Sequence, residues 1–295
     1  MDNSKKVAGC IIEIAEIIIS AVLITLTGLM AGSIVIGIIV SAILQMVSGS
    51  FYPALNESIS ASITSNFSFI MIIIFLVLYL KIFKKENLKD LLYLYKGRNK
   101  AKMVFAGIFA GFILCVLSIS VPVINGDIAL KFNRFDILIT PLVFLSIYIQ
   151  SSAEEIVLRG YVYGRVCKAY TEWAAIILNS LVFSFLHLNN NGINLNGIIS
   201  IILFGFLFSL LYSKTKSLEF ICGIHAMWGF TEEIIFGLPN SGKVFDMPVF
   251  CLIKSSQTPF YNEKFGIEAS IQTIFIVLAA IAVLLYNRHR NKNIL

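Results

Sequence analysis

The chain has 295 residues, of which 58% are hydrophobic and only 14% are charged, and its formal net charge is +6. Its mean hydropathy is +0.86. Soluble globular chains carry about 25% charged residues, so this chain has roughly half the charge that a water-facing surface requires. The composition excludes a disordered, collagen-like or nucleic-acid-binding chain and predicts an all-α polytopic integral membrane protein.

Apolar stretches of about 20 residues are long enough to cross a bilayer as helices. By this criterion the sequence predicts about eight transmembrane helices. Residues 7–27, where Glu13 and Glu16 lie on one face, are predicted as an N-terminal interfacial helix or as the lead-in to a long tilted first span. The predicted spans are 28–48, 67–83, 103–123, 136–153, 174–189, 196–213, 217–237 and 270–287.

The positions of the basic residues predict the orientation of the chain. Most Lys and Arg residues fall in segments that this span assignment places on one side, above all the loop 84–102. Cytoplasmic loops are enriched in Lys and Arg, so the N- and C-termini are expected in the cytoplasm. The frequent Ile, Asn and Lys suit an AT-rich bacterium, which indicates the bacterial cytoplasmic membrane.

Ionisable residues inside apolar helices are costly and usually functional. Glu154, Glu155 and Arg159 lie at the end of the fourth span, whereas His187 and His225 lie in the fifth and seventh. The chain has only 3 histidines, and two of them are in these apolar helices. Two histidines and a di-glutamate on three helices are difficult to explain by packing alone, so they predict a site.

Helical spacing suggests a role for each of these residues. Glu155 and Arg159 are four apart, which places them on one face as an ion pair. Glu154 is about 100° further round the helix and is left free to act as a general base. His187 is expected to share a water with Glu154, and His225 to stabilise an oxyanion. Such a site would hydrolyse an amide or ester, with Ser151, Ser152, Ser180 and Ser184 as candidates for lining a wet route to it.

At these residues the sequence resembles the CAAX-protease and bacteriocin-processing family of intramembrane proteases, also called the CPBP or Abi family. The resemblance covers Pro141 to Gly237, a third of the chain. Its motifs are a di-glutamate followed by Arg and Gly, an aromatic residue four before a histidine, and a later histidine. In this sequence they are Glu154, Glu155, Arg159, Gly160, Phe183, His187 and His225.

One position departs from the family pattern. The family places Asn four residues after the later histidine, and this chain has Gly229 there. The resemblance implies that this Asn helps the histidine stabilise the oxyanion, and losing one such donor typically costs about 10²- to 10³-fold in rate. Asn179, Asn189 or a bound water are candidates for replacing it.

The resemblance implies an endopeptidase that hydrolyses membrane-associated peptides or protein C-terminal segments. Its partners would be a peptide or protein substrate and the lipid bilayer, with no nucleic acid. Two chemistries stay open: a water activated by glutamate and histidine alone, or a metalloprotease whose divalent metal, zinc for example, is held by Glu154, His187 and His225. In either case Glu155 and Arg159 would position the first glutamate.

The resemblance also suggests a division of the chain. Residues 1–140 would hold the N-terminal membrane helices and the basic cytoplasmic loop, 141–240 the intramembrane protease core, and 241–295 an outer loop and the last helix. Gly229 keeps a second function open, that of a weakly active or inactive member acting as a membrane immunity or binding protein for a bacteriocin-like peptide. A cation transporter is less favoured because inverted repeats are not apparent.

Overall fold

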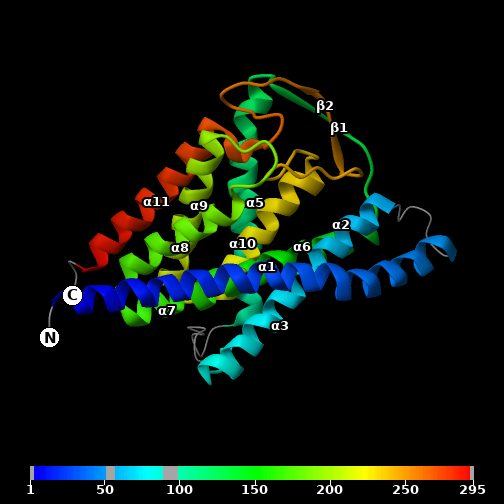
Figure 1. The fold of residues 1–295 in the computed structure, drawn as a ribbon. Coiled ribbons are helices and arrows are strands. Elements are labelled where there is room, and N and C mark those ends of the chain that lie inside the picture. The colour runs from blue at the N-terminus through cyan, green and yellow to red at the C-terminus, as the bar shows by residue number, and fades with distance from the viewer. Residues whose placement is uncertain (1–2, 51–56, 89–98, 293–295) are drawn as a thin grey trace.

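The computed structural model describes residues 3–50, 57–88 and 99–292. Helices dominate it, and two short strands cap one end (Figure 1). The long helices are α1 (Asn3–Ser50), α2 (Glu57–Ser68), α3 (Ile70–Tyr79), α5 (Lys100–Ile124), α6 (Ile139–Glu155), α7 (Tyr163–Ala169), α8 (Glu172–His187), α9 (Leu195–Thr215), α10 (Leu218–Gly229) and α11 (Ile271–Lys292). The strands are β1 (Ile128–Phe132) and β2 (Phe250–Ser255), and π-helical turns occur at Leu80–Lys84, Ile156–Val162 and Phe230–Ile235, with a short 3₁₀ turn at Ile267–Ala269.

Six helices in the described residues are long and apolar enough to cross a membrane. They are Ala8–Val47, Glu57–Lys84, Lys100–Ile124, Ile139–Ala169, Leu195–Thr215 and Ile271–Arg290. The predicted all-α polytopic membrane fold is therefore confirmed. The two other predicted spans, 174–189 and 217–237, correspond to the shorter apolar helix α8 and to α10 with the π-helical turn that follows it.

The N-terminal region follows the second of the two predicted alternatives. The helix α1 is continuous over 48 residues, so residues 7–27 lead into a long first span and do not form a separate interfacial helix. No proline interrupts this stretch, and the glycines within it do not end a helix that is apolar throughout. The start of α1 lies near the end of α11 (Figure 1). Tyr170, between α7 and α8, donates to the carbonyl oxygen of Cys10 at 3.1 Å, and Arg288 of α11 pairs with Glu172.

Close packing between α5 and α10 depends on three glycines. A Cβ added to Gly107 or Gly111 would lie 2.2 Å from the Phe220 oxygen or 2.4 Å from the Ile224 oxygen, and one on Gly223 would lie 2.7 Å from the Val104 oxygen. Small residues four apart let membrane helices approach at backbone distance, where van der Waals contacts hold them together. This contact fixes α10, the helix that carries His225.

The loops at the strand-bearing end are tied to the helices. β1 pairs antiparallel with β2, with Ile128 opposite Ser255. The buried Glu232 carboxylate, which follows α10, accepts a hydrogen bond from the Ile267 backbone N–H at 3.0 Å. This bond holds the turn Ile267–Ala269 against the end of α10.

We expect Gly111→Ala to destabilise the protein by about 1–3 kcal/mol, because the added methyl group meets the Ile224 carbonyl oxygen. Gly9→Ala is the matched control, since no atom lies within 4 Å of the position of its added Cβ. Thermal unfolding of both variants in the same detergent measures the difference. Equal melting temperatures would contradict the packing role of Gly111.

Candidate active site

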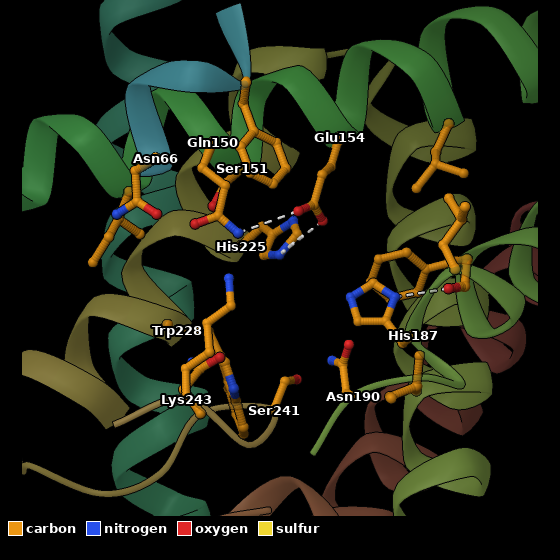
Figure 2. Close-up of a pocket in the computed structure, with 18 of the residues that line it drawn as sticks. Asn66, Gln150, Ser151, Glu154, His187, Asn190, His225, Trp228, Ser241 and Lys243 are labelled. Carbon is orange, nitrogen blue, oxygen red and sulfur yellow. Dashed lines mark hydrogen bonds and ion pairs between the residues drawn. The ribbon is translucent and has the colours of Figure 1, made fainter. Parts of the chain in front are cut away.

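A cavity of about 530 Å³ lies among α1, α2, α6, α8 and α10 and the loops at the strand-bearing end. Figure 2 shows its polar lining. Glu154, Gln150, Ser151 and His225 lie on one side, and His187, Asn190, Ser241 and Lys243 face them across the open space. The cavity therefore brings together three of the five predicted site residues, Glu154, His187 and His225.

The other two, Glu155 and Arg159, form a buried ion pair behind the cavity wall. Arg159 Nη1 donates to Glu155 Oε1 at 2.9 Å, and both side chains have no exposed surface. Arg159 also donates to the Gly205 carbonyl oxygen at 3.3 Å. Its guanidinium lies over the Phe183 ring, 4.9 Å from the ring centroid. These partners compensate for the cost of removing two charges from water.

A π-helical turn, Ile156–Val162, follows Glu155 directly and contains Arg159. Turns of this kind inside α-helices are rare and occur frequently at functional sites. Here the turn connects α6, which carries both glutamates, to α7.

Glu155 also contacts His225. Glu155 Oε1 lies 2.8 Å from His225 Nδ1. A carboxylate in this position fixes Nδ1 as the protonated nitrogen and turns Nε2 toward the cavity. The sequence predicts that Glu155 and Arg159 position Glu154, whereas in the structure Glu155 contacts His225 directly and Arg159 contacts Glu155.

Glu154 is the carboxylate that faces the cavity. Its side chain is 16% exposed, and Gln150 donates to its Oε1 at 3.2 Å. Glu154 Oε2 lies 3.9 Å from His225 Nε2, which is too long for a direct hydrogen bond. The two groups can therefore both contact a water or a substrate oxygen placed between them.

His187 enters the cavity from the end of α8. Its Nδ1 lies 2.8 Å from the Phe183 carbonyl oxygen. A carbonyl oxygen only accepts, so Nδ1 carries the proton and Nε2 of the neutral ring is an acceptor directed into the cavity (Figure 2). Phe183, the aromatic residue four before His187, therefore holds the histidine in two ways. Its backbone carbonyl accepts from Nδ1, and its ring contacts the imidazole with a centroid separation of 4.6 Å.

The possible zinc ligands do not come together. Within residues 3–50, 57–88 and 99–292, no three His, Cys, Asp or Glu side chains lie close enough to hold a metal ion. Figure 2 shows His187 on the opposite side of the open space from Glu154 and His225. The donor set of Glu154, His187 and His225 therefore does not fit a metal site in this arrangement.

The residues considered as replacements for the missing Asn lie elsewhere. Asn179 is fully buried; with its amide turned to satisfy both ends, its oxygen accepts from Arg159 Nε at 3.3 Å and its nitrogen donates to the Leu158 oxygen at 2.8 Å. Asn179 thus supports Arg159. Asn189 is exposed at the end of α8.

Sequence reasoning missed most of the polar lining that comes from other parts of the chain. Ser62, Ser65 and Asn66 of α2 line the cavity, as do Asn240 and Lys243 of the loop after α10. None of these residues stands in an apolar stretch or beside a motif, so the sequence offered no local signal. Of the four serines considered, Ser151 lines the cavity, and Ser180 donates to the Ile176 carbonyl oxygen at 2.6 Å instead.

Comparison with known proteins finds one matching family model. Residues 136–236 match the family model described as type II CAAX prenyl endopeptidase Rce1-like. This segment is therefore similar to the CAAX-protease family. It contains all five predicted site residues, and the similarity, together with the six apolar helices of the described residues, supports an integral membrane protein related to a protease family. No curated protein and no solved structure matches the chain.

We expect Arg159→Met to destabilise the fold by about 3–5 kcal/mol, because it leaves the charge of Glu155 buried without its partner. Arg165→Met is the matched control. Arg165 pairs with Glu86 at 2.7 Å, but both side chains are partly exposed, and such pairs contribute about 0–1 kcal/mol. Thermal unfolding of the two variants compares the two ion pairs directly. If Arg165→Met lost as much stability as Arg159→Met, the special role of burial would be contradicted.

Proposed function

We propose that the protein is an intramembrane endopeptidase that hydrolyses membrane-associated peptides or protein C-terminal segments with a water activated by glutamate and histidine. The observation that carries this proposal is the position of Glu154. It is a carboxylate in a polar cavity inside an apolar helix bundle, with His225 Nε2 at 3.9 Å and His187 across the same cavity. An intramembrane carboxylate with such neighbours is difficult to explain by packing.

In the proposed reaction, Glu154 takes one proton from a water in the cavity, and the second hydrogen of that water points across the cavity toward His187 Nε2. The water oxygen bonds to the carbonyl carbon of the scissile amide, and the carbonyl electron pair moves onto its oxygen. When this tetrahedral intermediate collapses, the carbon–nitrogen bond breaks and the leaving amine receives the proton from Glu154. The sum is one amide and one water giving one acid and one amine, and Glu154 is regenerated.

His225 supplies the positive charge that stabilises the oxyanion in this proposed reaction. In its imidazolium form the ring donates from Nδ1 to Glu155 and from Nε2 into the cavity, where the oxyanion develops. Glu155 and Arg159 therefore act as positioning residues for His225. A preformed donor of this kind stabilises the transition state more than the substrate, because the charge appears only there.

We expect Glu154→Gln to lower cleavage by at least about 10²-fold while leaving the fold intact, because the amide keeps the shape of the side chain and loses the base. The assay is mass spectrometry of apolar peptides incubated with the protein in liposomes. Glu263→Gln, on an exposed loop outside the cavity, is the matched control and should retain wild-type cleavage. Cleavage by Glu154→Gln at the wild-type rate would refute the proposal.

We also expect cleavage to continue at the wild-type rate after treatment with EDTA or 1,10-phenanthroline, because the candidate ligands do not converge on one point. The measurement is the cleavage rate before and after chelation, with a zinc protease in the same liposomes as the control. Loss of cleavage that returns on adding Zn²⁺ would show instead that Glu154, His187 and His225 rearrange around a metal.

A second candidate function is that of a non-catalytic immunity or binding protein for a bacteriocin-like peptide, and Gly229 is the observation that favours it. Survival of cells challenged with candidate bacteriocin peptides separates the two. A binding protein with Glu154→Gln still protects at equal membrane expression, whereas a protease with this change does not.

A further inference from the structure

Gly229 lies one helical turn after His225 on α10 and lines the cavity. It has no side chain, and the space beside it is occupied by an amide from another part of the chain. A Cβ built on Gly229 would lie 3.1 Å from Asn240 Nδ2 and 4.0 Å from Asn240 Cγ. The amide of Asn240 therefore stands where a side chain at position 229 would begin.

Asn240 is held in this place by a tight turn. Its backbone N–H donates to the Lys243 oxygen at 2.8 Å, and the Lys243 N–H donates to the Asn240 oxygen at 2.9 Å. Gly242, with φ +84°, packs so closely that an added Cβ would lie 2.1 Å from the Asn191 oxygen. Ser241 donates to the Glu268 carboxylate. The turn is therefore held by its own backbone hydrogen bonds and by its contacts with Asn191 and Glu268.

The side-chain amide of Asn240 is available as a donor. It lines the cavity and is partly buried, and in the portion of the chain that the structure describes it makes no hydrogen bond. A partly desolvated amide N–H with no acceptor is a strong donor for a charge that develops nearby. Asn179, by contrast, is already engaged with Arg159 and Leu158.

We propose that Asn240 is the second oxyanion donor of the site, acting beside His225 from the loop after α10. This inference rests on the proposed function, because an oxyanion forms only if the protein hydrolyses an amide or ester. Glycine at position 229 leaves room for this amide, because a Cβ there would crowd Asn240 Nδ2 at 3.1 Å. The amide N–H would act together with His225 Nε2 on the oxygen of the tetrahedral intermediate.

The first test is the kinetics of Asn240→Ala and Asn240→Asp. Both remove the donor, and the second keeps the size of the side chain. We expect kcat to fall about 10²-fold in each, with KM changed by less than about threefold, because the donor acts mainly in the transition state. Asn125→Ala, an exposed residue at the end of α5, is the matched control and should leave both constants unchanged.

The second test moves the donor. Gly229→Asn in the Asn240→Ala background should recover at least about tenfold of the lost kcat, because the new amide enters the space that the truncation leaves. Gly229→Asn alone should lower the rate, since its Cβ crowds the Asn240 amide. A merely structural role for Asn240 would not give this reversal, and additive effects of the two changes would overturn the proposal.

The third test does not depend on turnover. A phosphinate peptide imitates the tetrahedral anion, and its amide parent imitates the substrate. In the Glu154→Gln protein, Asn240→Ala should weaken phosphinate binding by at least about tenfold and leave binding of the amide unchanged. Equal effects of Asn240→Ala on the binding of the two ligands would overturn the proposal. The proposal would also fail if Lys243→Met abolished selective phosphinate binding and Asn240→Ala did not.

These results separate the two proposals. Cleavage by the wild type with unchanged kcat in both Asn240 variants would refute the role of Asn240 and leave the protease intact. Absence of cleavage by the wild type would refute the proposed function and with it an oxyanion role, while the phosphinate comparison would then show only whether Asn240 binds a tetrahedral anion.

Discussion

The site depends on one buried carboxylate that contacts two side chains, a guanidinium and an imidazole. Glu155 has no exposed surface, and its Oε1 lies 2.9 Å from Arg159 and 2.8 Å from His225. A buried charge is stable only if its partners stay in place, because the loss of a partner leaves the charge uncompensated. Glu155 therefore constrains α6, the π-helical turn after it and α10 relative to one another, and through α10 it sets the direction of the His225 ring.

Close backbone packing makes this arrangement possible. α10 approaches α5 across Gly107, Gly111 and Gly223, and α9 approaches α8 at Gly205, whose carbonyl oxygen accepts a hydrogen bond from Arg159. In a bilayer the apolar effect does not favour helix contact over lipid contact, so small residues and buried polar bonds determine which helices meet. Gly205 therefore both permits the packing of α9 on α8 and supplies a carbonyl acceptor to Arg159.

Local chemistry was predictable from the sequence, and long-range chemistry was not. The pairing of Glu155 with Arg159 follows from a spacing of four residues, and the apolar spans follow from composition. By contrast, the contact of Glu155 with His225 joins residues 70 apart and depends on helix packing. Helix packing also sets the distance between the candidate zinc ligands: the ring of His187, whose Nδ1 is engaged by the Phe183 carbonyl oxygen, lies across the open space from Glu154 (Figure 2).

The loop after α10 shows how a departure from a family motif is interpreted physically. A donor on a helix is held by the helix itself, but a donor on a loop is only as well placed as the loop. In this chain the loop is fixed by the bond from Ile267 to Glu232, by the bond from Ser241 to Glu268, and by the turn that contains Asn240. Because position 229 is glycine, the donor amide comes from the loop and not from α10. Its position therefore depends on these loop contacts, whose buried groups lie outside the motif.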